Sequence, residues 1–197
     1  MNKLGFVRHG VTQWNKEGRA QGRTDIPLDE EGLNQARLLA ERMERGVWDI
    51  VYASDLKRAA QTAEIINGKL ETELCLDSRL REVDCGLIEG TTEQERIREW
   101  GPRWRELDMQ FESHASIISR GMNFIDELSK NHSNKNILIV SHGSFIKHLL
   151  QELSPEAGLN DSLLNTSLTS LLKCESGWEC ELYNWTDHLL SDGSLKT

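Results

Sequence analysis

Apolar residues in the first third of the chain recur with the spacings of buried strands and amphipathic helices. Short apolar runs at 4–7 and 49–53 predict two buried strands. Apolar side chains three and four positions apart over about 30–45 and 56–66 predict a helix after each strand. This alternation of strand and helix is typical of α/β proteins.

Polar residues predict where these two helices begin and end. Asp29 is the expected N-cap of the first helix, because its carboxylate can accept a hydrogen bond from an amide of the first turn. Asn67-Gly68 is expected to end the second helix, since both residues tolerate the left-handed conformation that commonly terminates helices.

The rest of the chain continues the alternation and ends in a hairpin pattern. Further strands are predicted at 74–76, 137–140, 168–173 and 178–184. Helical spacing covers 93–132, with a break near Gly101-Pro102, and returns over 145–153. The pattern therefore predicts an α/β three-layer sandwich with a mostly parallel central sheet flanked by helices.

The length of 197 residues suits a single domain, which we expect to span 1–197. The sequence has no internal repeat and no linker rich in Pro, Gly or Ser. Trp100 and Trp104 lie four positions apart in a segment with helical spacing. We expect this segment, around 90–115, to form a helical cap beside the functional site.

Charge and cysteine content narrow the class of partner. Lys and Arg number 23 against 32 Asp and Glu, a net charge of −9, which disfavours nucleic acid and anionic membranes as partners. No apolar run reaches the length of a membrane span, and none of the four cysteines lies in a Cys-x-x-Cys pair. We therefore expect a cytoplasmic protein; the pattern says nothing of its oligomeric state.

Residues suited to catalysis follow the predicted parallel strands. Arg8-His9-Gly10 follows the first strand, Ser141-His142-Gly143 follows the strand at 137–140, and Arg58 lies in the first turn after 49–53. Glu82 lies in the loop after 74–76. Ligands of such sheets bind beyond the carboxyl ends of the strands, so we expect these side chains to meet in one crevice.

The chemistry of this group is suited to phosphate esters. The planar guanidinium of arginine matches phosphate oxygens, and a neutral imidazole nitrogen can attack phosphorus. A carboxylic acid can protonate the leaving oxygen, and the helix N-terminus at Gly143 adds amide donors for an anion. The arginines oppose a divalent cation, so we expect no metal, and no Gly-x-Ser-x-Gly motif supports a serine hydrolase.

Several ordered blocks resemble the histidine phosphatase superfamily, also called the phosphoglycerate mutase-like family. The blocks run from about residue 3 to residue 190: Arg8-His9-Gly10 with Thr12 and Asn15, Gln21 to Leu28, Ser54 to Thr62, Leu80-Arg81-Glu82 with Glu89-Gly90, Ser141-His142-Gly143, and Asn165-Thr166-Ser167. The resemblance implies a phosphoglycerate mutase-like fold, with one histidine phosphatase domain over 1–197.

The resemblance also implies roles for matching residues. His9 would be the nucleophile that forms a phosphohistidine, and Glu82 would protonate the leaving oxygen and then activate water. Phosphoryl-binding and substrate-lining roles fall to Arg8, Arg58, His142, Asn15, Gln21, Gly22 and Gly143. Glu112, in a block similar to the family's Gly-Glu-Ser, would contact the substrate. No metal or organic cofactor is implied.

Departures from the family pattern favour a phosphatase acting on a small phosphorylated metabolite. Mutases carry Glu-Arg-His-Tyr-Gly where this chain has Glu82-Val83-Asp84-Cys85-Gly86, and their segment between the acid and the second histidine is longer. A shorter covering segment admits water to the phosphoenzyme and so favours hydrolysis. Phosphoglycerate mutase remains the first alternative, and a non-catalytic phosphate-binding module the second.

Overall fold

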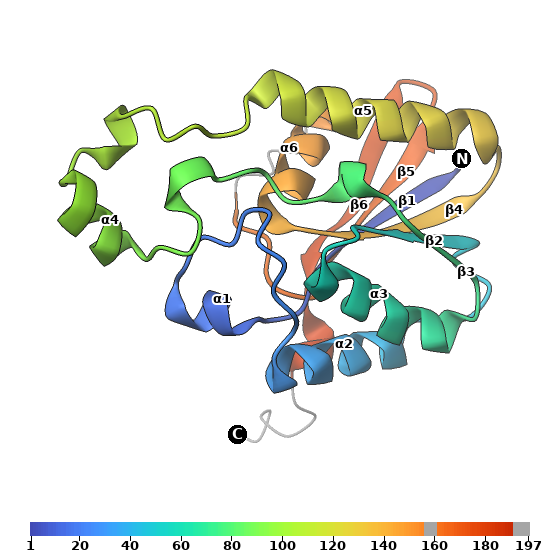
Figure 1. The fold of residues 1–197 in the computed structure, drawn as a ribbon. Coiled ribbons are helices and arrows are strands. Elements are labelled where there is room, and N and C mark those ends of the chain that lie inside the picture. The colour runs from blue at the N-terminus through green and yellow to red at the C-terminus, as the bar shows by residue number, and fades with distance from the viewer. Residues whose placement is uncertain (156–160, 191–197) are drawn as a thin grey trace, which may run out of the picture.

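A six-stranded sheet in the order β3-β2-β4-β1-β5-β6 forms the centre of the protein (Figure 1). The structure is a computed structural model that describes residues 1–155 and 161–190. Four strands run parallel: β1 (Lys3–Arg8), β2 (Ile50–Ala53), β3 (Glu73–Leu76) and β4 (Asn136–Ser141). β5 (Leu168–Cys174) and β6 (Gly177–Trp185) add an antiparallel hairpin at one edge. The predicted α/β class with a mostly parallel sheet is confirmed.

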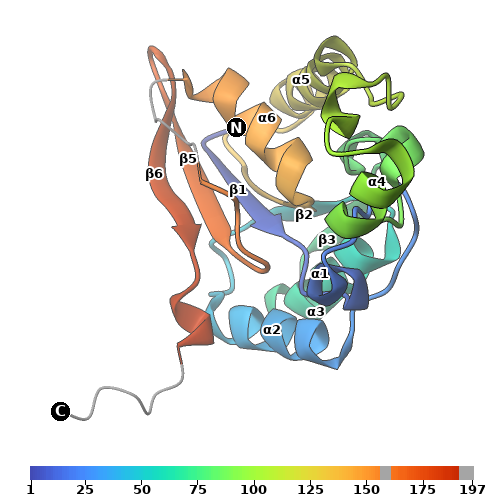
Figure 2. The same cartoon turned by 90° about the vertical axis from the view of Figure 1, so that its left-hand side faces the viewer.

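Helices cover both faces of the sheet and complete three layers (Figures 1 and 2). The helices α5 (His114–Asn131) and α6 (Gly143–Leu153) pack on one face, and α2 (Glu30–Arg42) and α3 (Lys57–Leu70) pack on the other. Each helix turns one apolar stripe toward the sheet, as its spacing predicts. Burial of these stripes against the apolar strands forms the core on each face.

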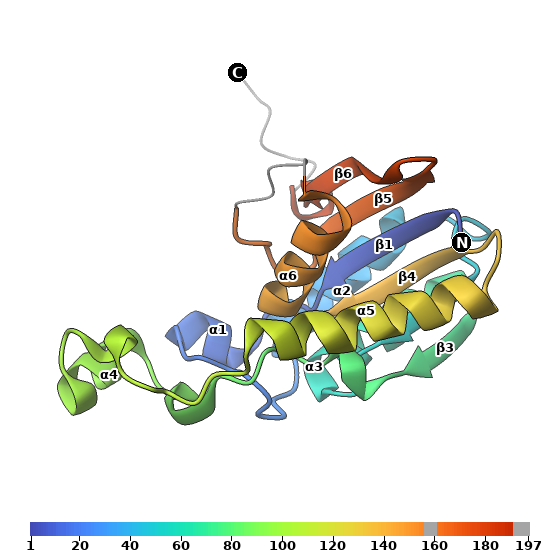
Figure 3. The same ribbon diagram turned by 90° about the horizontal axis from the view of Figure 1, so that it is seen from above.

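Two short helices lie beyond the carboxyl ends of the parallel strands (Figures 1 and 3). They are α1 (Gln13–Glu17) and α4 (Glu93–Trp100). Trp104, just after α4, packs with Ile88 and Met109 in a small separate apolar cluster. The residues between Leu107 and Ser113 are not helical, so the helical spacing predicted over 93–132 is wrong there. Ser113 caps α5 instead, because its side chain accepts a hydrogen bond from the Ser116 amide.

The predicted helix ends are right at Asp29 and wrong at Asn67-Gly68. Asp29 caps α2 by accepting a hydrogen bond of 2.8 Å from the Gly32 amide. α3 runs on to Leu70, because this buried side chain extends the apolar stripe of the helix. Glu71 takes the left-handed conformation in place of Gly68, with φ of 55°.

We predict that Phe124→Ala lowers the free energy of unfolding by about 3–5 kcal/mol, the usual cost of emptying a buried phenylalanine site. Phe124 is fully buried on α5 and packs edge-on against Tyr52. The matched control is Phe111→Ala, because Phe111 is 47% exposed and should lose little. Chemical denaturation measures both variants, and equal losses would contradict the placement of Phe124 in the core.

Candidate active site

Parallel pairing of β1 and β4 brings the two predicted histidines together. The register sets Arg8 opposite Ser141, so the next residues, His9 and His142, leave the sheet side by side. Their ring centroids lie 5.2 Å apart with the planes tilted by 59°. The His9 amide also donates a hydrogen bond of 2.9 Å to the Ser141 carbonyl.

His9 is held as a neutral imidazole with one nitrogen available. Its Nδ1 lies 2.7 Å from the Gly10 carbonyl oxygen, which only accepts hydrogen bonds, so Nδ1 carries the proton. Nε2 therefore keeps its lone pair. Burial first, and then the nearby charges of Arg8 and Arg58, lower the pKa of His9 well below its ordinary value. The ring is uncharged near neutral pH, as a nucleophile must be.

Two guanidinium groups lie beside the imidazoles, that of Arg58 fully buried and that of Arg8 partly buried. Arg58 is fully buried, and its Nη atoms donate to the carbonyls of Thr24 at 2.7 Å and Gly22 at 2.8 Å. Arg8 donates to the Leu163 carbonyl at 2.5 Å. Within the part of the chain that the structure describes, neither arginine forms an ion pair with a carboxylate. Both positive charges therefore remain available to an anion.

Buried nitrogen atoms without a hydrogen-bond partner gather at this point. They are Nε of Arg8, Nε of Arg58 and both ring nitrogens of His142. Burial, together with the charges of Arg58, His9 and Arg8, lowers the pKa of His142 well below its ordinary value. Buried polar atoms are nearly always hydrogen-bonded in folded proteins, so this cluster is suited to a ligand rich in oxygen acceptors.

The Glu82 carboxylate lies at the N-terminus of α6. Its Oε1 accepts hydrogen bonds of 2.9 Å from the Phe145 and Val83 amides, and its Oε2 accepts one of 3.2 Å from the Ser144 amide. These three amides fix the side chain in one orientation. Both Glu82 and His9 line the cavity described next, so a carboxyl group and an imidazole face the same space.

A cavity of about 240 Å³ collects most of the predicted residues. Its lining is Arg8, His9, Asn15, Arg19, Ala20, Gln21, Gly22, Arg58, Glu82, Cys85 and Ser144. A neighbouring cavity of about 250 Å³ shares Arg8, Glu82 and Ser144 and also includes Gly143 and Lys147. His142 lines neither cavity, because it lies fully buried beside His9.

Some residues at this site had no predicted role. The amide Nδ2 of Asn165 donates to the His9 carbonyl at 2.9 Å, and Thr62 Oγ1 accepts from the Gly10 amide at 3.1 Å. Thr62 lies one helical turn after Arg58, which is the signal that places both on one face of α3. Arg19 lines the cavity through its place after α1, a helix that no apolar spacing predicted.

Glu112 lies outside the linings of both cavities, and its predicted substrate contact stays a prediction. Its side chain is only 5% exposed, and it pairs with Arg120.

Over residues 1–155 and 161–190, no cluster of three or more His, Cys, Asp or Glu side chains is placed to hold a metal ion. Over the same residues, no helix combines the length and apolar character of a membrane span.

Comparisons with known proteins agree with this geometry. The sequence model of the histidine phosphatase superfamily (branch 1) matches residues 4–186. The uncharacterized phosphatase PhoE of Bacillus subtilis is 35% identical, covering 96% of this chain and 97% of its own. The probable phosphoglycerate mutase GpmB of Yersinia enterocolitica is 33% identical, covering 96% and 95%. A solved phosphoserine phosphatase of Entamoeba histolytica, in complex with 3-phosphoglyceric acid, has a TM-score of 0.79 at 33% identity, covering 96% and 100%.

The chain therefore belongs to the histidine phosphatase superfamily, and it is a phosphatase of that class. Relatives named as mutases are present among its matches, alongside those named as phosphatases. The resemblance inferred from the ordered motifs is confirmed, and so is the phosphoglycerate mutase-like fold.

Buried neutral histidines predict a loss of stability in acid. Burial lowers the pKa of His188 to about 4, while an unfolded chain protonates histidine near 6.5. Between these values the unfolded state takes up a proton that the folded state refuses, so stability is complete above about pH 6.5 and falls as the pH drops toward 4. His188 alone accounts for roughly 3 kcal/mol of that loss.

The measurement is the free energy of unfolding from pH 8 to pH 4. We expect His188→Gln to flatten the acid limb relative to the unsubstituted protein. His114→Gln is the control, because His114 is exposed at the start of α5. An acid limb unchanged by His188→Gln would contradict the buried neutral state.

Proposed function

We propose that this phosphatase hydrolyses phosphomonoesters of small phosphorylated metabolites through a phosphohistidine on His9. The observation that supports this most is a neutral imidazole with a free Nε2 in a cavity that the guanidinium groups of Arg8 and Arg58 also line. Phosphoryl transfer depends mainly on positioning and charge stabilisation, and the buried arginines provide both.

In the first step, Nε2 of His9 forms a bond to phosphorus while the bond to the ester oxygen breaks. Glu82, in its protonated form, gives its proton to the leaving oxygen, which departs as an alcohol. Arg8, Arg58 and His142 stabilise the charge of the transferred group. The Gly10 carbonyl accepts from Nδ1 throughout, and so stabilises the phosphorylated ring.

In the second step, the Glu82 carboxylate removes a proton from water. The water oxygen bonds to phosphorus as the bond to Nε2 breaks, which releases inorganic phosphate and restores neutral His9. Asn15, Gln21 and Gly22 line the cavity beside His9, and Gly143 lines its neighbour; we assign these four residues to substrate binding. The proposed mechanism requires no metal ion or organic cofactor.

The proposed substrate is a small molecule, because the two adjoining cavities of about 240 and 250 Å³ suit a metabolite. The solved relative bound to 3-phosphoglyceric acid supports that class. The four cysteines are all free thiols, which supports the cytoplasm as the proposed compartment. We also propose that the helical segment around 90–115 acts as the cap of a single domain over 1–197.

His9→Ala is predicted to abolish hydrolysis of p-nitrophenyl phosphate, because, among the described residues, His9 is the only imidazole that lines the cavity of about 240 Å³. EDTA should leave the unsubstituted enzyme fully active. His114→Ala is the control and should retain full activity. A His9→Ala variant with appreciable turnover would refute the nucleophile assignment.

Phosphoglycerate mutase is a second candidate, favoured by the relative of that name. We predict that incubation with 3-phosphoglycerate and 2,3-bisphosphoglycerate yields only inorganic phosphate by phosphorus NMR. The reason is the acid loop, where Val83, Asp84 and Cys85 replace the arginine, histidine and tyrosine of mutases. Formation of 2-phosphoglycerate would support the mutase instead. Tight binding of phosphoesters with no turnover would instead support the second alternative, a non-catalytic phosphate-binding module.

A further inference from the structure

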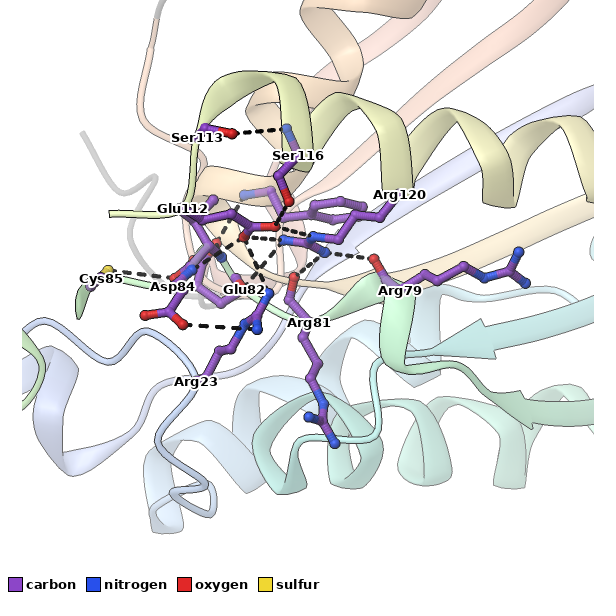
Figure 4. Close-up of polar contacts among 12 residues, drawn as sticks. Arg23, Arg79, Arg81, Glu82, Asp84, Cys85, Glu112, Ser113, Ser116 and Arg120 are labelled. Atoms are coloured by element: carbon purple, nitrogen blue, oxygen red, sulfur yellow. Dashed lines mark hydrogen bonds and ion pairs between the residues drawn. The ribbon is translucent and has the colours of Figure 1, made fainter. Parts of the chain in front are cut away.

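A largely buried ion pair lies between α5 and the loop that carries Glu82 (Figure 4). Arg120 donates from Nε to Glu112 Oε1 at 2.9 Å and from Nη2 to Glu112 Oε2 at 3.1 Å. The side chains are 14% and 5% exposed. Neither residue lines either cavity, so the pair has no direct contact with the substrate space.

The same guanidinium binds the backbone on both sides of the acid. Arg120 Nη1 donates to the carbonyls of Arg79 at 2.6 Å and Arg81 at 2.7 Å, and Nη2 donates to the Glu82 carbonyl at 3.3 Å. The Asp84 amide donates to Glu112 Oε2 at 3.3 Å. The ion pair therefore holds the backbone before, at and after Glu82.

A second contact connects Arg120 to the carboxylate of Glu82. The guanidinium carbon lies 4.3 Å from the centroid of the Phe145 ring. The Phe145 amide in turn donates to Glu82 Oε1. Arg120 thus contacts both the main chain of Glu82 and the residue that fixes its side chain, and a lysine has no planar fork with which to make this set of bonds.

We propose that Arg120, paired with Glu112, is a positioning residue for the general acid Glu82. It acts by fixing the loop so that the carboxyl group meets the leaving oxygen, without touching the substrate. This inference rests on the proposed function of Glu82. Proton transfer demands close alignment of donor and acceptor, and a shift of about 1 Å costs about 100-fold in rate.

The test measures kcat/KM for aryl phosphates that differ in the basicity of the leaving phenol. p-Nitrophenol leaves with little help from an acid, whereas phenol and p-methoxyphenol need a proton. The variants are Arg120→Met and Glu112→Gln, with Glu82→Gln as the reference for loss of the acid. Should Arg120→Met fail to fold, Arg120→Lys and Glu112→Gln carry the test.

We expect Arg120→Met to lower kcat/KM by no more than about threefold for p-nitrophenyl phosphate and by about 10- to 100-fold for phenyl phosphate. Glu112→Gln should steepen the dependence on phenol basicity in the same direction, by less. Arg120→Met should add no further loss for phenyl phosphate in a Glu82→Gln background, because the positioned group is already gone.

Two controls separate positioning from general damage. Arg103→Met removes an arginine that is 83% exposed, and Ile125→Val trims a buried side chain of the same helix. Neither should change the dependence on phenol basicity. Equal losses on all aryl phosphates in Arg120→Met would overturn the inference.

The outcome also separates this inference from the proposed function. If kcat/KM depends more steeply on phenol basicity in Glu82→Gln but not in Arg120→Met, only the role of Arg120 is refuted. If the dependence of kcat/KM on phenol basicity is unchanged in Glu82→Gln, the acid role of Glu82 is refuted, and the positioning role of Arg120 is refuted as well.

Discussion

Placement of two guanidinium groups, one fully and one partly buried, beside two buried imidazoles is the constraint on which the rest of the site depends. Removing a charge from water is costly unless hydrogen bonds or an opposite charge compensate for it. In the described residues, Arg58 is compensated by the carbonyls of Gly22 and Thr24, and Arg8 by that of Leu163. Carbonyl oxygens solvate the cations without neutralising them. Burial first, and then the positive field that remains, lower the pKa values of His9 and His142 and keep both rings uncharged, and the same field is complementary to a phosphate dianion.

The loop that supplies the carbonyls of Gly22 and Thr24 to Arg58 has to be rigid. The carboxylate of Glu89 holds it in place. Glu89 accepts hydrogen bonds from the amides of Arg23 at 2.7 Å and Thr24 at 3.1 Å, and from the Cys85 amide at 3.3 Å. Gly22 has φ of +47°, and a Cβ there would lie 1.8 Å from Glu89 Oε1. Only glycine fits at that position. Glu89 therefore connects the loop that holds Arg58 to the loop that carries the acid.

The positions of His9, His142, Arg58 and Glu82 were predictable, because the carboxyl ends of parallel strands meet at one edge whatever the details of pairing. The register of β1 on β4 was not predictable, since it depends on packing across the whole sheet. This register is what sets the two imidazoles side by side. The pairing of Arg120 with Glu112 was hidden for a similar reason. In the sequence Arg120 looks like a solvated charge and the family resemblance gives Glu112 a substrate contact, and only the docking of α5 brings the two side chains together. Local signals failed at Asn67-Gly68, where burial of Leu70 outweighs the propensity to stop.

The two chemical tasks are supported by opposite layers of the fold. The grip on phosphate depends on α3, which carries Arg58 and Thr62, and on the loop from Gln21 to Thr24. The acid depends on α5 and α6, through Arg120 and through the amides of Ser144 and Phe145. Side-chain replacements in the loop after Glu82 that leave Glu89 in place therefore act on the leaving-group side, apart from the contacts that hold Arg58.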